Sequence, residues 1–201
     1  MNFDFLKECK MESPELQGMY EAVSAELEKA EWRYFRKPQE CGILLRGTAE
    51  NICRIYNTYY EVGYPKEASL EDFLCYTDND AHNVLVSRFL SVLRKEQRDR
   101  LNKLRVLGDD CIWGEEAPDQ SMSFQDRMSQ NARRMMETMM EALKEMCMKI
   151  NKREDIQDRV FHEEILPEQR EQILAEIERE QKEHVEKEKK TWFRRIFTGR
   201  V

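Results

Sequence analysis

The sequence predicts an all-α fold, and three observations lead to that prediction. Apolar residues recur at steps of three and four over several long stretches, as in helices that bury one face. Only seven glycines and five prolines occur in 201 residues, so few positions force a helix to end. Serine or proline helix-start signals precede most of the stretches. The expected architecture is a helical bundle over residues 1–150 and a charged helical extension over residues 151–201.

The N-terminal part is predicted to contain a lead-in and one long helix. The lead-in, residues 1–12, carries three apolar side chains that we expect to dock on the core: Phe3, Phe5 and Leu6. Ser13 has the properties of an N-cap, and Pro14 suits the first helical position. The helix that they open is predicted to run to about Arg36.

A second helix is predicted from Pro38 to about Val62. Its apolar residues cover a wide arc, so we expect it at the centre of the core. Gly42 and Gly47 lie inside it, each at a cost of roughly 1 kcal/mol relative to alanine. Close approach of a neighbouring helix is the expected compensation at both glycines.

Shorter helices are predicted next. The segment Ser69–Asp72 resembles a capping box with Asp in place of Glu, and it opens a short helix through Tyr76. Residues 77–80 are an expected turn, and helices follow over about 81–93 and 95–107. Gly108 is predicted to be the residue that stops the second of these. Residues 109–120, which include Trp113, are then an expected loop.

The sixth predicted helix begins at Ser123 and runs to about Ile150. Its broad apolar face is rich in methionine, which is typical of a buried core at helical spacing and also of an adaptable partner groove. The core is the stronger interpretation. Residues 151–166 are an expected polar connection with a short helical piece, and Pro167 begins a last, highly charged helix.

The tail, residues 187–201, changes character because it holds six basic residues against one acidic residue, a net charge of +5. Aromatic and aliphatic side chains alternate with the basic ones. The segment therefore suits an anionic membrane surface, an acidic protein groove or its own acidic body. The residues expected to make such contacts are Lys189, Lys190, Trp192, Phe193, Arg194, Arg195, Ile196 and Phe197.

Composition restricts the function classes. The net charge of −7 does not attract phosphate backbones over long range, so nucleic-acid binding through the acidic body is not expected. None of the six cysteines forms a C-x-x-C pair and only three histidines occur, which argues against a zinc cluster or other cofactor site. The N-terminus has no apolar signal-peptide core. We therefore expect a cytoplasmic protein with reduced and mostly buried thiols.

Candidates for catalysis are few. The three histidines, at positions 82, 162 and 184, lie in polar helical contexts without a cysteine or serine partner at a recognisable spacing. No phosphate-binding glycine loop is present. The acidic pairs Asp109-Asp110 and Glu115-Glu116 offer oxygen ligands for a hard cation, although solvated loop charge is the stronger interpretation.

One stretch, Leu104 to Trp113, resembles a known pattern. Leu104, Arg105 and Gly108 match a Leu-Arg-x-x-Gly-Asn signature that a histidine follows. Further similarities keep the same order along about residues 1–150: Asn2 to Leu6, Ala30-Glu31, Tyr34, Pro38, Leu45-Arg46, Glu50 and Ala68 to Leu70. Together these residues resemble a HEPN-like family, a domain of unknown function found at the N-terminus of type I restriction endonuclease R subunits and related helicases.

The resemblance implies a HEPN-like helical bundle, and the departures from it bear on activity. In HEPN ribonucleases an arginine and a polar residue near a histidine line a dimer cleft and cleave RNA without metal. Here the signature's asparagine falls on Asp109 and its histidine on Trp113. An indole N–H only donates, so it cannot move the proton that such chemistry requires. Arg105 remains, and we expect it either to pair with Asp109 or Asp110 or to cap the local structure.

Three functional hypotheses follow. The first is a non-catalytic HEPN-like interaction module, an adaptor or sensor in a restriction or anti-phage context, with a larger restriction or helicase effector as partner and a homodimer implied by the resemblance. Its binding residues would be Arg46, Glu50, Arg105, Asp109, Asp110 and Trp113. The second is a divergent metal-independent ribonuclease or toxin that uses Arg46, Arg105 and Asp109. The third is a membrane-surface or partner-tethered protein that acts through its tail.

Overall fold

The computed structural model of the chain describes residues 1–11, 13–114 and 122–163, together with residues 175 and 179. The chain divides into two compact units, Met1–Phe161 and His162–Val201. Within the described residues the first unit forms six α-helices and two short 3-10 helices, with no strand, so the predicted all-α class is confirmed. Of the predicted last helix only residues 175 and 179 are described, and both are helical; the tail contacts from Lys189 to Phe197 lie outside the described residues.

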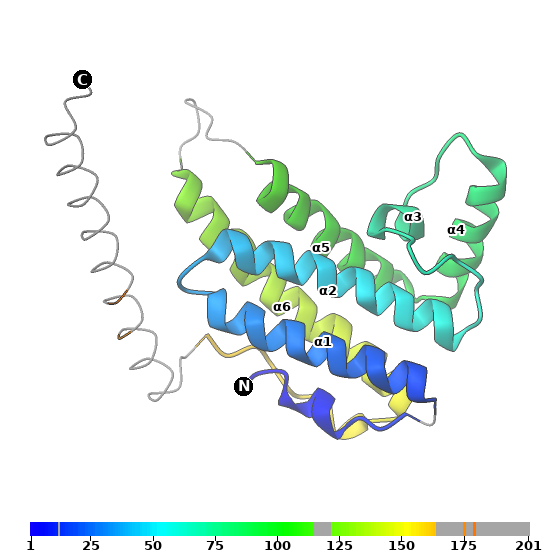
Figure 1. Cartoon of the computed structure of the whole chain (residues 1–201), viewed down its shortest axis with the longest axis horizontal. Helices are drawn as coiled ribbons and strands as arrows, with labels where there is room; N and C mark the ends of the chain where they lie inside the picture. Colours follow the sequence, from blue (N-terminus) through cyan, green and yellow to red (C-terminus); the bar gives the residue numbers. More distant parts are fainter. Residues whose placement is uncertain (12, 115–121, 164–174, 176–178, 180–201) are drawn as a thin grey trace, which may run out of the picture. The chain divides into compact units, whose positions relative to one another are not determined.

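Helix α2, Pro38–Tyr59, is the central element of the bundle. It packs against three other helices: α1, α5 and α6 (Figure 1). Its buried residues cover the wide arc expected from the sequence and include Leu45, Ile52 and Ile55, all with no exposed surface. The expected central position of this helix is therefore confirmed, and its apolar arc is wide because it has neighbours on several sides.

Helix α1, Pro14–Arg33, begins as predicted. The side chain of Ser13 accepts a hydrogen bond from the backbone N–H of Leu16, and Pro14 occupies the first turn. The helix ends three residues before the expected Arg36. The N-terminal lead-in forms a 3-10 helix, η1 (Asp4–Glu8), and its predicted docking residues are buried: Phe3, Phe5 and Leu6.

Two shorter helices, α3 (Leu70–Leu74) and α4 (Asp80–Val92), form a smaller apolar cluster at one end of the bundle (Figure 1). The rings of Phe73 and Phe89 lie 4.9 Å apart, and Tyr64 contacts both. The predicted capping box is confirmed, because Ser69 and Asp72 exchange hydrogen bonds at the start of α3. These rings belong to the same hydrophobic core as the rest of the bundle.

Helix α5, Lys95–Trp113, is longer than the sequence predicts. Gly108 does not stop it, and residues 109–113 are helical rather than part of a loop. The helix ends where the backbone N–H of Gly114 donates to the carbonyl of Asp110 at 2.8 Å. Gly108 is inside the helix for a tertiary reason, since the side chain of Arg46 lies against it.

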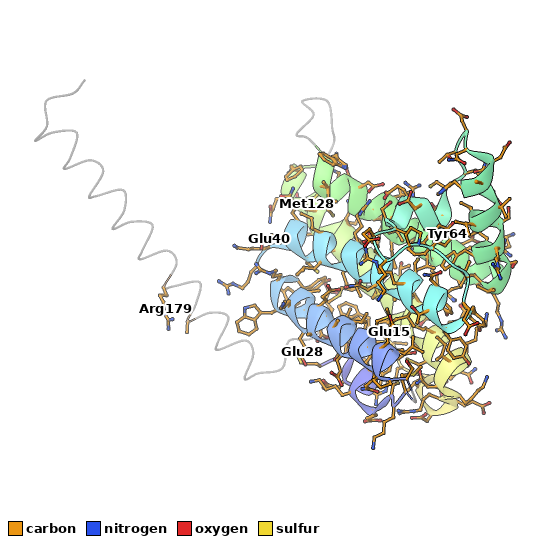
Figure 2. The ribbon with its side chains drawn as sticks, turned by 45° about the vertical axis from the view of Figure 1, so that its right-hand side comes forward. Glu15, Glu28, Glu40, Tyr64, Met128 and Arg179 are labelled. Carbon is orange, nitrogen blue, oxygen red and sulfur yellow. The ribbon has the colours of Figure 1, made fainter. Side chains whose placement is uncertain are left out.

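Helix α6, Phe124–Asn151, begins at the predicted N-cap, where the Ser123 side chain accepts a hydrogen bond from the backbone N–H of Asp126. The methionine face is core rather than an open groove, because six of its methionines are at most 1% exposed: Met128, Met135, Met136, Met139, Met140 and Met146. Figure 2 shows Glu40 and Met128 at one end of the bundle and Tyr64 at the other. A second 3-10 helix, η2 (Glu154–Ile156), follows α6 and is the only helical piece with assigned bounds in the described part of 151–166.

The length and the hydropathy of each helix decide whether it could cross a membrane. Among the residues that the structure describes, no helix is both long enough and apolar enough to cross a bilayer.

Candidate functional site

The candidate site lies where α2 and α5 cross in antiparallel directions. Two glycines make this crossing close. A Cβ added to Gly42 of α2 would lie 2.3 Å from the sulfur of Cys111, and one added to Gly108 of α5 would lie 2.5 Å from the Cβ of Arg46. The close approach expected at Gly42 is confirmed. At Gly47 it is wrong, because nothing lies within 4 Å of an added Cβ there.

Arg46 forms the centre of the site. Its stem crosses α5 at Gly108, and its guanidinium then reaches two carboxylates. The Nε donates to Asp109 Oδ1 at 2.8 Å, and the Nη2 donates to Glu71 Oε1 at 2.5 Å. Partial burial opposes the positive charge, but these hydrogen bonds outweigh it and raise the pKa of Arg46 above its ordinary value. The side chain is 17% exposed, so it is held in place rather than solvated.

Arg105 joins the same cluster from α5. Its Nη1 donates to Asp109 Oδ2 at 3.1 Å, so Asp109 bridges the two arginines. Its Nε and Nη2 donate to Asn102 Oδ1 at 3.2 and 3.0 Å. The expected ion pair between Arg105 and Asp109 is therefore confirmed. Two arginines face two carboxylates, Asp109 and Glu71, so the cluster carries no net formal charge.

Glu50 lies one turn further along α2 and serves a different neighbour. One of its carboxylate oxygens accepts from Arg54 Nη2 at 2.5 Å, and the other accepts from the backbone N–H of Leu70 at 3.1 Å. That N–H belongs to the first turn of α3, where helix N-termini leave donors without partners. Glu50 therefore acts as a second cap at the start of α3 and links α3 to α2. Neither of these two hydrogen bonds involves Arg46, Arg105 or Asp109.

Asp110 points to α6 instead of the cluster. Its Oδ2 accepts from Asn131 Nδ2 at 2.7 Å and lies 3.6 Å from Arg127 Nε. Asn131 is 4% exposed, so this bond satisfies a buried amide. Both aspartates of the pair at 109–110 are thus in a helix and in ion pairs. The interpretation of this pair as solvated loop charge is wrong.

Trp113 occupies the last turn of α5 and is 77% exposed. It does not fill the space beside Arg46 and Arg105. Val106 is seven residues earlier, so it lies two turns back on nearly the same face of α5, and it is 50% exposed. The C-terminal half of this helix therefore presents two large apolar side chains to solvent beyond the ion-pair cluster.

The arrangement offers little for acid–base or metal chemistry. The cluster consists of guanidinium groups, carboxylates and amides, and arginine does not deprotonate near neutral pH.

Nε2 of His82, the histidine on α4, lies 3.2 Å from the Cys75 carbonyl, and its ring packs edge-on to Tyr64. His162 is exposed, and His184 lies outside the described residues, as do Glu115 and Glu116. In the part of the chain that the structure describes, no group of three His, Cys, Asp or Glu side chains could hold a metal ion.

Two residues that take part in these contacts, Glu71 and Asn131, were not predicted from the sequence. Glu71 belongs to the predicted capping segment, where its acidic side chain looked like ordinary first-turn charge. Asn131 lies in the middle of α6, and a buried asparagine has no distinctive sequence pattern. Both become visible only when helices distant in sequence are placed side by side.

Comparisons with protein-family models, with curated proteins and with solved structures found no match to this chain. The similarity to the HEPN-like family therefore rests on the order and spacing of the sequence motifs. The six α-helices of the first unit, within the residues that the structure describes, establish the all-α class alone, and that class includes many unrelated functions.

Proposed function

We propose that the chain is a non-catalytic HEPN-like helical interaction module that acts as an adaptor or sensor. The observation that carries the proposal is Trp113, whose side chain is 77% exposed at the end of α5, beside a cluster of neutralised arginines. An exposed tryptophan on a rigid helix is a typical anchor for a protein partner.

The state of the arginines supports binding of protein rather than cleavage of RNA. Arg46 and Arg105 share Asp109, and Arg46 also holds Glu71. A phosphate would have to displace these carboxylates and would meet their negative charge. The group that would move a proton in a HEPN ribonuclease is replaced by Trp113, which only donates a hydrogen bond.

The exposed side chains of the C-terminal half of α5 support a contact surface that combines two large apolar side chains with charged ones. Val106 and Trp113 provide exposed apolar area, and Arg105, directly before Val106 in sequence, has 22% of its side chain exposed. Interfaces favour tryptophan and arginine and exclude water around such anchors. A larger restriction or helicase effector, or a second copy of the chain, is the partner that the motif similarity implies.

RNA cleavage provides the first test. We expect the purified chain to leave structured and single-stranded RNA intact over long incubation without metal, because the carboxylate beside Arg105, Asp109, is already paired with both Arg46 and Arg105. Arg105→Ala and Trp113→His are assayed in parallel. Cleavage by the unmodified chain that disappears in the Arg105→Ala variant would contradict the proposal and establish a ribonuclease.

Site-specific photo-crosslinking tests the surface itself. A photoreactive phenylalanine derivative replaces Trp113 in one variant and Val84 in a matched control, because Val84 is also exposed, at 67%, but lies on α4. In cells that carry the intact native gene neighbourhood, we expect one protein to crosslink from position 113 and not from 84. A crosslink to a second copy of the chain would assign the surface to a homodimer. Equal, diffuse labelling from both positions would remove this surface from the proposal.

A further inference from the structure

Two cysteines that are far apart in sequence meet inside the first unit. Cys9 follows η1, and Cys147 lies near the end of α6. Figure 1 shows these two segments side by side. Their sulfur atoms are 3.6 Å apart, although 138 positions separate them in the chain. Cys9 is 1% exposed and Cys147 is fully buried, and both are free thiols. Two sulfurs in contact need to move by only about 1.5 Å to reach the length of a disulfide bond.

The Cys9 thiol donates to the Phe5 carbonyl at 3.5 Å and to the Cys147 sulfur at 3.6 Å. The hydrogen bond between the two thiols lowers the pKa of Cys9; burial opposes this, the positive charge of Arg153 lowers the pKa further, and the charges of Glu8 and Asp155 raise it. Arg153 is held close by, because its Nη2 is paired with Glu8 at 2.8 Å and with Asp155 at 2.6 Å. Its backbone N–H also donates to the carbonyl of Cys147. Cys147 has its pKa raised well above the ordinary value, chiefly by its hydrogen bond with Cys9, so Cys9 is the more acidic thiol of the two.

We propose that Cys9 and Cys147 are a redox-active thiol pair that closes to a disulfide when the chain meets a peroxide. The pair would join the N-terminal segment covalently to α6. This site is independent of the α2–α5 surface, and its assignment does not rest on the function proposed above.

The reaction balances with hydrogen peroxide as the oxidant. The Cys9 thiolate attacks one peroxide oxygen, the O–O bond breaks, and the products are a sulfenic acid at Cys9 and a hydroxide ion. Cys147 then attacks the Cys9 sulfur, the S–O bond breaks, and the Cys147 proton leaves with the departing hydroxide as water. The proton that Cys9 loses on ionisation converts the first hydroxide to water. Overall, two thiols and one hydrogen peroxide give one disulfide and two waters, so the thiols lose two electrons and the peroxide gains them.

A second pair of neighbouring thiols in the bundle lacks these features. Burial raises the pKa of Cys111 to about 11, and the neighbouring Asp110 raises it further. The pKa of Cys41 is also raised, first by burial and then by Cys111. A thiol that stays protonated is a poor nucleophile. Peroxide should therefore distinguish Cys9 and Cys147 from Cys41 and Cys111, even though all four are buried.

Because both thiols are buried, the proposal requires local opening of the N-terminal segment, which would also lift the buried Phe5 and Leu6 from the core. Its last residues are tied down near the surface by the ion pair between Glu8 and Arg153, in which the Glu8 side chain is 62% exposed. Exposed ion pairs of this kind contribute little free energy, and terminal segments open more readily than helices in the core. Hydrogen peroxide is small, so a brief opening is sufficient.

The test uses the full, folded chain. The reduced protein is titrated with hydrogen peroxide, free thiols are blocked by alkylation, and peptides are mapped by mass spectrometry without reductant. We expect one dominant crosslink between the peptides that carry Cys9 and Cys147, with a mass loss of two hydrogens. We also expect the thermal midpoint to rise by about 5 °C or more and to fall again with dithiothreitol, because the bond restrains a long loop in the unfolded chain.

Three variants complete the test. Cys9→Ala and Cys147→Ala should each abolish both the crosslink and the thermal shift, whereas Cys53→Ala, at another fully buried cysteine, should keep them. The wild-type peptide map remains decisive if a variant fails to fold. If peroxide oxidises the partly exposed Cys75 completely while Cys9 and Cys147 stay alkylatable, the proposal is wrong. A dominant crosslink between any other two cysteines would overturn it equally.

Discussion

Gly108 of α5 lies directly against the side chain of Arg46 of α2. A Cβ at position 108 would be 2.5 Å from the Arg46 Cβ, 2.8 Å from its Cγ and 2.9 Å from its Cδ. The Cβ is fixed by the backbone, so this contact cannot be relieved by rotating the side chain and requires the helix backbone to move. The absence of a side chain at residue 108 thus lets the arginine stem lie flat across α5 and delivers its guanidinium to Asp109, one residue further on.

Gly108→Ala should destabilise the chain by about 1–2 kcal/mol, because overpacking at the crossing outweighs the higher helix propensity of alanine. Gly47→Ala is the matched control, since Gly47 is also inside a helix but has nothing within 4 Å of an added Cβ. It should stabilise the chain by about 0.5–1 kcal/mol. Urea unfolding followed by circular dichroism measures both. Equal effects of the two substitutions would show that the crossing tolerates a larger residue.

Arg46→Met and Arg46→Ala separate the two roles of this side chain. Methionine keeps an unbranched apolar stem against Gly108 and removes only the ion pairs, so we expect a loss of about 1 kcal/mol. Alanine removes the stem as well, and its loss should be larger by about 1–2 kcal/mol. Thermal unfolding at low and high salt checks this. If the two variants unfold at the same temperature, the stem contributes nothing and the ion pairs carry the whole effect.

Asp72 should make stability depend on pH. Hydrogen bonds from the backbone and side chain of Ser69 hold the pKa of Asp72 below its ordinary value of 3.8, although partial burial opposes them. A depressed pKa in the folded state means that the stabilisation is present above about pH 4 and is lost as the pH falls through the folded value. The difference in unfolding free energy between the wild type and Asp72→Asn should therefore shrink below pH 4. A difference that stays constant down to pH 2 would contradict the assignment.

Met139 tests whether the methionine face of α6 is core. Its side chain has no exposed surface. Met139→Ala should cost about 2–5 kcal/mol because it leaves a cavity, whereas Met139→Leu, which nearly conserves volume, should cost less than about 1.5 kcal/mol. Denaturant unfolding gives both values. A small loss for the alanine variant would indicate an adaptable groove at this position.

The helix starts could be predicted because their signals are local. Ser13, Ser69 and Ser123 each accept a hydrogen bond from a backbone N–H in the first turn that follows, which short-range sequence is sufficient to specify. The apolar periodicity likewise identified the buried faces of α1, α2 and α6. The sequence motifs singled out Arg46, Arg105 and Asp109, and the structure brings these three into one cluster.

The end of α5 could not be predicted in the same way. A glycine after an apolar stretch is the common signal for a helix stop, and Gly108 has that context. Its function in the fold is instead to admit a side chain from another helix, and no local pattern distinguishes the two uses. The partners of Asp110 and Glu50 were hidden for the same reason, because they come from α6 and α3.

The sequence by itself therefore determined the all-α class, the starts of the helices and the residues that enter the core. These properties depend on interactions within one or two helical turns and on burial of apolar faces. The tertiary structure alone decided that α5 continues through Gly108 to an exposed Trp113, that Arg46 and Arg105 share one aspartate, and that Cys9 meets Cys147. Each of these depends on the distance between segments far apart in the chain, which packing fixes and local sequence does not encode.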